Sequence, residues 1–201
     1  FDGIIVATPV HVAARVVKST SDVLSDQLSG IDVASSAVVI NGFRREDISH
    51  PLDGFGLVVP SREKRTILAC SFSSIKFAGR APEGKVLLRT FVGGACQPEM
   101  LEKSDEEIHL SVQKELQELL GVRSEPIFKQ VVRWNKAMPQ YHLGHLQRVE
   151  QIDQQLAHYP GLALAGNGLH GVGIPQCIHS GESAAERILK SWQATKQQLA
   201  E

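Results

Sequence analysis

A glycine-rich turn between a short apolar segment and a long helical segment is the feature that most constrains the fold of this chain. Residues 162–165 are all apolar, and residues 166–171 follow as Gly-Asn-Gly-Leu-His-Gly. We predict a helix from Pro175 to about Leu199, because proline favours the first turn of a helix. A strand that enters a helix through such a turn is typical of α/β domains whose backbone approaches a ligand closely.

The turn matches the G-x-G-x-x-G pattern of dinucleotide-binding folds letter by letter. That pattern carries its function inside a βαβ unit, and no second strand follows the predicted helix in this sequence. We therefore favour a turn in which small residues and the free amides of the helix start lie against a flat, negatively charged group, such as a reduced flavin. A plain strand–turn–helix without a ligand remains an alternative.

The beginning of the chain shares this α/β character. Residues 4–7 are apolar and mostly β-branched, which predicts a strand buried on both faces. An imperfect helical stripe follows over residues 11–28, with a break near residues 19–21. The first residue is Phe1 and not methionine, and a predicted core strand follows at once, so we expect this chain to be a piece of a longer protein.

The middle of the chain has the pattern of consecutive strands bounded by glycine and proline. Strands are predicted at residues 36–43, 55–59, 66–72 and 85–92. Ser104 and Glu107 then form a capping-box sequence, which predicts a helix that ends at Gly121. The remaining predicted elements are a strand at 127–134, a loop at 135–141 and a helix at 143–158. Short turns between consecutive strands favour an antiparallel sheet.

We therefore predict an α/β (α+β) fold with two domains. A mixed or antiparallel substrate-domain sheet with helices, residues 31–158, is inserted into part of a Rossmann-like cofactor-binding domain. That second domain would be formed by residues 1–30 together with the strand–turn–helix of residues 159–201.

Composition excludes several classes of function. The chain has 201 residues, 42% of them hydrophobic, and a formal net charge of -1, which gives no argument for a nucleic-acid partner. It contains no signal peptide and no apolar run of about 20 residues that would span a bilayer. The wide spacing of Cys70, Cys96 and Cys177 favours reduced thiols in a cytoplasmic protein. His142 and His145 have no third ligand nearby, so no metal site is predicted.

Four segments together resemble the FAD-dependent amine-oxidase-like flavoproteins and, within that superfamily, the protoporphyrinogen oxidase family. Residues 164–181, with Gly171-Val172-Gly173-Ile174, resemble the terminal flavin motif of the superfamily. The other segments are residues 51–60 (PLDGFGLVVP), residues 72–82 (FSSIKFAGRAP) and residues 133–145, which include Ala137-Met138-Pro139-Gln140-Tyr141. Their order and spacing match over nearly the whole chain, and the resemblance implies that this chain is the carboxyl-terminal half of such a protein.

The resemblance implies an oxygen-dependent, FAD-containing oxidase of haem biosynthesis that dehydrogenates protoporphyrinogen or coproporphyrinogen to the porphyrin. It implies that FAD contacts Asn167, Val172, Gly173 and Ile174. It also implies that a sheet holds the tetrapyrrole around Phe55, Gly56, Val58, Ser71 and Phe91. An apolar slot with aromatic side chains suits such a ring, although ordinary core packing is the alternative for Phe55 and Phe91. The three-residue spacing from Phe55 to Val58 places them on opposite faces of a regular strand, unless Gly56 interrupts it.

The expected partners are the porphyrinogen and oxygen, with no catalytic side chain assigned in this chain. The family's pyrophosphate loop and substrate arginine are not found in this sequence, so we expect this chain alone to be inactive and to lack stoichiometric FAD. Alternatives are an inactive folded module and another flavoenzyme of the superfamily, such as a carotenoid desaturase or an amine oxidase. An amine oxidase would be expected to carry an aromatic pair near the terminal flavin motif. It is disfavoured because no tyrosine or tryptophan lies between Tyr159 and Trp192. A homodimer and a peripheral membrane contact through segments outside this chain are left open.

Overall fold

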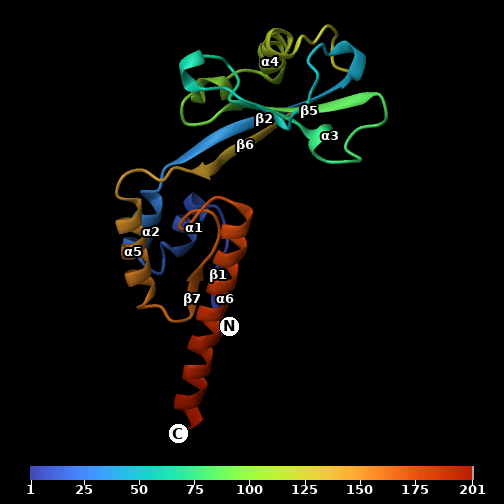
Figure 1. Ribbon diagram of the computed structural model, residues 1–201. Coiled ribbons are helices and arrows are strands. Elements are labelled where there is room, and N and C mark those ends of the chain that lie inside the picture. Colours follow the sequence, from blue (N-terminus) through green and yellow to red (C-terminus); the bar gives the residue numbers. More distant parts are fainter. Residues whose placement is uncertain (201) are drawn as a thin grey trace. The chain divides into compact units, whose positions relative to one another are not determined.

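The computed structural model describes residues 1–200, which form two compact units (Figure 1). Unit 1 consists of Phe1–Val33 together with the residues from Lys136 onward, and unit 2 consists of Ala34–Asn135. Each unit has its own cluster of buried hydrophobic side chains. The chain therefore leaves unit 1, builds unit 2 and returns to unit 1.

Unit 1 is built on a two-stranded parallel sheet with helices packed around it. The strands are β1 (Ile4–Val6) and β7 (Leu162–Leu164), and Ile5 lies opposite Ala163. The helices are α1 (Val10–Val17), α2 (Asp22–Ser29), α5 (His145–Leu156) and α6 (Ile174–Ala200). The predicted break at residues 19–21 is confirmed, because Ser21 caps α2 by accepting a hydrogen bond from the Leu24 amide at 3.2 Å.

The burial predicted for the first strand is wrong at two of its residues. Val6 is 6% exposed, whereas Ile4 is 56% and Ile5 43% exposed. Among the described strands, β1 pairs with β7 alone. A continuous apolar run is buried on both faces only inside a wider, covered sheet, which these two strands do not form.

The boundary at which the chain returns from unit 2 to unit 1 differs from the predicted one. The predicted substrate domain ended at residue 158, whereas the compact unit ends at residue 135, so α5 belongs to unit 1. The reason is hydrophobic burial: Val149, Ile152 and Leu156 of α5 join the same core as Leu24 and Leu28 of α2. The assignment of flavin and substrate roles to these ranges stays a prediction.

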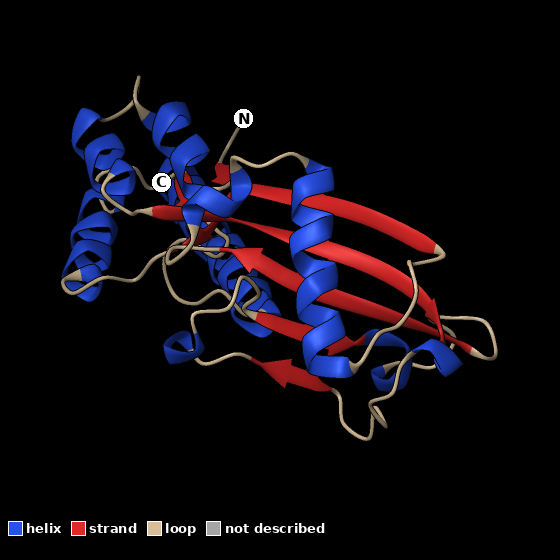
Figure 2. Ribbon diagram, turned by 90° about the horizontal axis from the view of Figure 1, so that it is seen from above, coloured by secondary structure: helices blue, strands red, loops and turns tan. Residues whose placement is uncertain are grey.

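Unit 2 is a five-stranded sheet with one long helix across it (Figure 2). In spatial order the strands are β3 (Gly56–Val58), β4 (Ala69–Phe72), β5 (Lys85–Gly93), β2 (Val33–Arg44) and β6 (Phe128–Pro139). The β3–β4, β4–β5 and β2–β5 pairs are antiparallel, as predicted. The short α3 (Ser73–Lys76) follows β4, and 3-10 helices lie at Arg45–Asp47, Ser61–Glu63 and Pro98–Leu101.

The loop predicted at residues 135–141 is wrong over most of its length, because β6 continues to Pro139. The Gln140 amide donates to the Asp32 carbonyl at 2.8 Å just beyond that end. β6 is an edge strand, and proline is tolerated at an edge because no neighbouring strand needs its missing amide hydrogen. Pairing with β2 therefore overrides the local turn signals.

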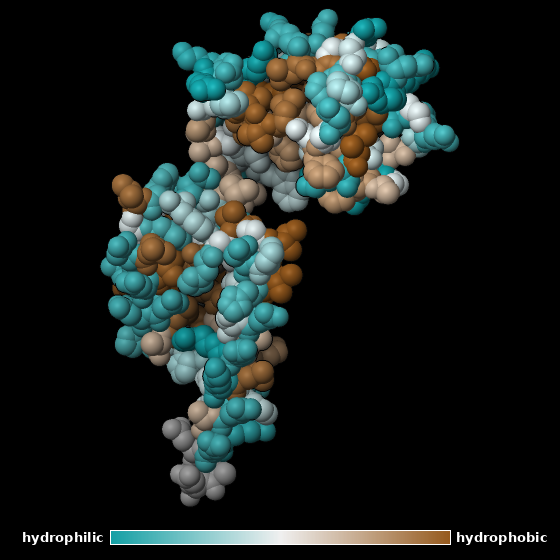
Figure 3. Space-filling view, in the orientation of Figure 1, coloured by the Kyte–Doolittle hydropathy of each residue, from teal (hydrophilic) through white to brown (hydrophobic). Residues whose placement is uncertain are grey.

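Helix α4 (Asp105–Leu120) begins and ends where the sequence predicts. The Ser104 hydroxyl accepts from the Glu107 amide at 3.3 Å, and the Glu107 carboxylate accepts from the Ser104 amide at 2.8 Å. Gly121 ends the helix with a φ of 61°. The apolar face of α4 packs against the sheet, where hydrophobic residues gather in Figure 3. Its buried members are Ile108, Val112, Leu116 and Leu120.

Glu115 ties α4 to the loop before β4. Its carboxylate accepts from Arg65 Nη1 at 2.8 Å and from both the amide and the hydroxyl of Thr66 at 2.9 Å. Burial acts to raise the pKa of Glu115, but these hydrogen bonds and the Arg65 charge outweigh it and lower the pKa below the ordinary value of 4.5. A buried carboxylate held by several donors stabilises the fold only while it is ionised.

We expect the free energy of unfolding to fall as the pH drops through the lowered pKa of Glu115. The native state binds this proton less tightly than the unfolded state, so the contribution is complete above pH 4.5 and is lost below it. Glu115→Gln should reduce that dependence, as measured by urea unfolding at pH 7 and pH 3. Glu118→Gln is the matched control, because Glu118 also meets Arg65 but is about half exposed. An unchanged pH dependence in Glu115→Gln would contradict this account.

Candidate functional site

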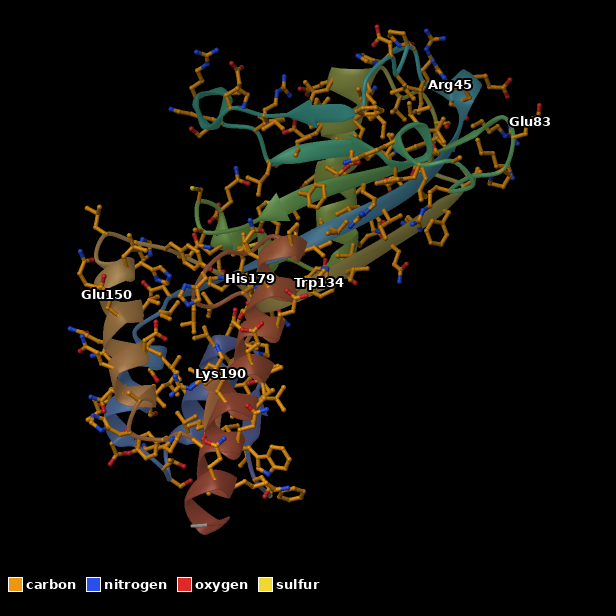
Figure 4. All side chains as sticks on the ribbon, turned by 60° about the horizontal axis from the view of Figure 1, so that its bottom comes forward. Arg45, Glu83, Trp134, Glu150, His179 and Lys190 are labelled. Atoms are coloured by element: carbon orange, nitrogen blue, oxygen red, sulfur yellow. The ribbon has the colours of Figure 1, made fainter. Side chains whose placement is uncertain are left out.

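In the part of the chain that the structure describes, the face of the unit 2 sheet opposite α4 is exposed at Val58, Arg89 and Trp134, whereas Val38 of β2 is buried. On β5, Val86, Leu88, Thr90 and Val92 are buried on the α4 side. Side chains alternate along a strand, so the intervening residues of β5 lie on the other face. Figure 4 brings that face toward the viewer, with α4 behind the strands.

Strand register aligns four of the five predicted substrate residues on this open face. One row across the strands is Val58, Ala69, Phe91 and Val38. The next row is Gly56, Ser71, Arg89 and Ile40. We call these two rows the open-face rows. Gly56, Val58, Ser71 and Phe91 were singled out in three separate segments of sequence, and the fold makes them neighbours.

Phe55, the fifth residue, lies just before β3 and is 68% exposed. A regular strand would place it beside Leu57, which packs against the core. Gly56 prevents this with a φ of 151°, a conformation in which a Cβ would overlap the carbonyl oxygen of Cys70. The core alternative is therefore wrong for Phe55, and Val58, 81% exposed, also lies outside the core.

The open face continues onto β6, which the sequence analysis did not include in the site. Lys129 and Arg133 bind Glu106 and Asp105 on the α4 side. By alternation, the exposed Phe128 and Trp134 lie on the open face, with Trp134 labelled in Figure 4. The alternation of β6 was available in the sequence, but its register relative to β2 was not.

The glycine-rich turn lies in unit 1, between β7 and α6. Gly166 and Gly171 have φ values of 120° and 140°, which favour glycine. The Gly173 carbonyl accepts from the Cys177 amide at 3.0 Å, so Gly173 immediately precedes the first turn of α6. Val172 and Ile174 on either side of it are exposed. Exposed apolar side chains at a helix start fit the edge of a flat, partly apolar ring such as a flavin.

Tyr141 holds this turn in place. Its hydroxyl donates to the Asn167 carbonyl at 2.6 Å and accepts from the Gly171 amide at 2.9 Å. Burial raises the pKa of the Tyr141 hydroxyl, so it stays a neutral donor near pH 7. The Asn167 side chain, predicted to contact FAD, donates to the Ala137 carbonyl at 3.1 Å. This hydrogen bond of the Asn167 side chain therefore lies within unit 1.

The ring of His145 packs against the ring of Tyr141. The two rings stack with centroids 4.0 Å apart and an angle of 12° between their planes. His145 Nε2 lies 2.8 Å from the Leu169 carbonyl, which makes this nitrogen the donor. His142 instead meets Asp32 at 3.3 Å. Within the described residues, no group of three histidine, cysteine, aspartate or glutamate side chains is placed to hold a metal ion.

A cavity of about 360 Å³ lies beside the turn in unit 1, lined by residues of α5, β7 and α6. Leu169 and His170 of the turn line it, but Asn167, Val172, Gly173 and Ile174 do not. No helix among the described residues is long and apolar enough to cross a membrane.

Comparisons with known proteins agree on one family. The family model described as flavin containing amine oxidoreductase matches residues 1–189. Coproporphyrinogen III oxidase of Bacillus subtilis (strain 168) is 36% identical over 189 residues, covering 94% of this chain and 40% of that protein. Mitochondrial protoporphyrinogen oxidase of Nicotiana tabacum is 33% identical over 194 residues, covering 94% and 38%.

A solved structure shares the fold. It is a crystal structure of an Exiguobacterium sp. 255-15 protein assigned provisionally as a protoporphyrinogen oxidase, with a TM-score of 0.80 and 30% identity. The match covers 94% of this chain and 41% of that one. This chain thus spans about 40% of the length of the curated relatives that it matches.

Proposed function

The chain belongs to the flavin containing amine oxidoreductase family, and we propose that it supplies two parts of a longer porphyrinogen-oxidising enzyme. The first part is the open face of unit 2, which binds the porphyrinogen. The second is the turn before α6, which contacts FAD. Relatives named coproporphyrinogen III oxidase and protoporphyrinogen oxidase both match this chain, which supports a porphyrinogen as the substrate class.

The convergence of Gly56, Val58, Ser71 and Phe91 on one open face is the observation that carries this proposal. The face offers a broad surface in which apolar side chains outnumber polar ones, with aromatic rings on β5 and β6. Such a surface stacks well against a large, flat macrocycle. Phe55 extends it at the edge, since Gly56 turns that side chain away from the core.

In this proposal FAD, the open face and the turn have separate roles. FAD supplies the electron-accepting chemistry, with oxygen as the proposed final acceptor. The open face holds the macrocycle and excludes water from one side of it. The turn orients the flavin through backbone amides and through the exposed Val172 and Ile174. No side chain on the open-face rows is assigned as a general base.

The test is the kinetics of Phe55→Ala and Val58→Ala in the full-length enzyme. Each should raise the KM for porphyrinogen about tenfold, because removing apolar atoms from a binding pocket costs about 1–3 kcal/mol. Their melting temperatures should stay near the wild-type value, since both side chains are exposed.

Val39→Ala is the matched control for Val58→Ala. Val39 is fully buried on the α4 side of β2, so this variant should lose stability and keep its KM. The proposal fails if Phe55→Ala and Val58→Ala keep the wild-type KM, or if their dominant effect is the loss of stability expected of a core residue.

A further inference from the structure

We propose that Arg89 is a substrate-binding residue of the open face, whose guanidinium binds a propionate carboxylate of the porphyrinogen. This inference rests on the proposed function of that face, and it adds a residue to which neither the sequence analysis nor the family match gave a role. Arg89 lies on β5, the third of the five strands, between Ser71 and Ile40 in the open-face rows. By strand spacing it lies roughly 10 Å from Gly56, on the same face.

The side chain of Arg89 is held on the surface that would receive the macrocycle. Its guanidinium carbon lies 5.7 Å from the centroid of the Phe91 ring. An arginine in this position gains a cation–π interaction while its donors stay available. Arg89 and Phe91 together therefore offer a charged group and an aromatic surface side by side.

Three other arginines of unit 2 have polar partners, whereas the exposed side chains of Arg44 and Arg123 make no hydrogen bond or ion pair with a described residue. Arg65 binds Glu115 and Glu118, and Arg133 binds Asp105 and two carbonyls of the segment before α4. Arg45 donates to the carbonyls that follow its own 3-10 helix. The exposed side chain of Arg89 makes no ion pair or hydrogen bond with any residue that the structure describes. The contact with the Phe91 ring leaves the N–H donors of Arg89 without a hydrogen-bond acceptor among the described residues.

The surroundings of Arg89 favour the binding of a carboxylate that is attached to a large apolar group. The strand residues of the open face include no aspartate or glutamate, and Lys85 and Arg44 are paired opposite each other at the far end of the same face. A single charge used to protect a sheet from aggregation is expected on an edge strand, not on a central one. A porphyrinogen offers the matching chemistry, a broad apolar ring that carries carboxylate arms.

The experiment compares Arg89→Leu, Arg89→Lys and wild type in the full-length enzyme, with free-acid coproporphyrinogen, free-acid protoporphyrinogen and their uncharged methyl esters as substrates. Arg89→Leu should raise the KM for at least one free acid about tenfold or more, because a hydrogen bond to a charged group is lost. The KM for the ester should hardly change, so the preference for the acid shrinks. Arg89→Lys should restore part of that preference.

Arg80→Leu is the matched control. Arg80 also lies over an aromatic ring, 5.9 Å from the centroid of Phe77, but in the loop after α3 and outside the open-face rows. It should keep the wild-type KM for every substrate. If Arg89→Leu raises the KM for both acids, Arg89 binds one of the propionates that the two substrates share. A rise for coproporphyrinogen alone assigns a carboxylate that protoporphyrinogen lacks, and both results support the proposal.

The role of Arg89 is overturned if Arg89→Leu leaves the KM for both free acids and the preference for acid over ester unchanged. If Phe55→Ala and Val58→Ala still raise the KM, the open face binds the substrate and only the assignment of Arg89 has failed. If wild-type enzyme does not oxidise either porphyrinogen, the proposed function itself has failed.

Discussion

Replacing Gly56 by valine is expected to lower both the stability of unit 2 and the affinity for porphyrinogen. The φ of 151° is strained for any residue with a side chain, which costs on the order of 1–3 kcal/mol. A Cβ at this position would also overlap the Cys70 carbonyl oxygen and press on Ser71, so β3 would have to move away from β4. Because β3 carries Val58 and positions Phe55, the substrate surface would be displaced with it.

Thermal unfolding and steady-state kinetics of the full-length enzyme measure the two effects. Gly54→Val is the matched control, because a Cβ at Gly54 meets nothing within 4 Å. The control should unfold near the wild-type temperature and keep its KM. Gly56→Val should unfold earlier and show a raised KM. A Gly56→Val enzyme with normal stability and normal KM would show that this glycine does not shape the site.

Replacing Gly173 by aspartate in the full-length enzyme is expected to weaken flavin binding without unfolding unit 1. Gly173 immediately precedes α6, and aspartate is a favourable residue at that position of a helix. Its Cβ would meet the end of the flexible Gln176 side chain, which can move. The carboxylate would neutralise the positive end of the helix and oppose a negatively charged, reduced flavin.

Flavin absorbance per chain and the flavin redox potential measure this effect. We expect an affinity for FAD about tenfold weaker and a lower potential, with an unchanged melting temperature of the flavin-free protein. Ala185→Asp places the same charge on an exposed position of α6 away from its start, and it should keep wild-type flavin binding. Retention of FAD at an unchanged potential in Gly173→Asp would remove the turn from the flavin site.

Local signals were sufficient where one short segment determines the structure. The capping box at Ser104 and the stop at Gly121 predicted α4 correctly, because both depend on backbone groups within a few residues. The break before α2 was predicted for the same reason. The family resemblance then selected Gly56, Val58, Ser71 and Phe91, which strand register brings together.

The remaining features depend on pairing between distant segments. The exposure of Phe55 follows from one dihedral angle of Gly56, which β-strand alternation does not reveal. Arg89 acquires its neighbours from the register of β4, β5 and β2. The hydrogen bonds of Tyr141 join segments 26 and 30 residues apart, and no local pattern predicts them.

The most direct test of the central claim is a crystal structure of the full-length enzyme with a bound porphyrin. We predict that the ring lies within van der Waals distance of Val58, Ala69 and Phe91, on the face of the sheet opposite α4. We also predict a carboxylate within hydrogen-bonding distance of the Arg89 guanidinium. A porphyrin bound elsewhere, with the open-face rows covered by protein, would contradict the account.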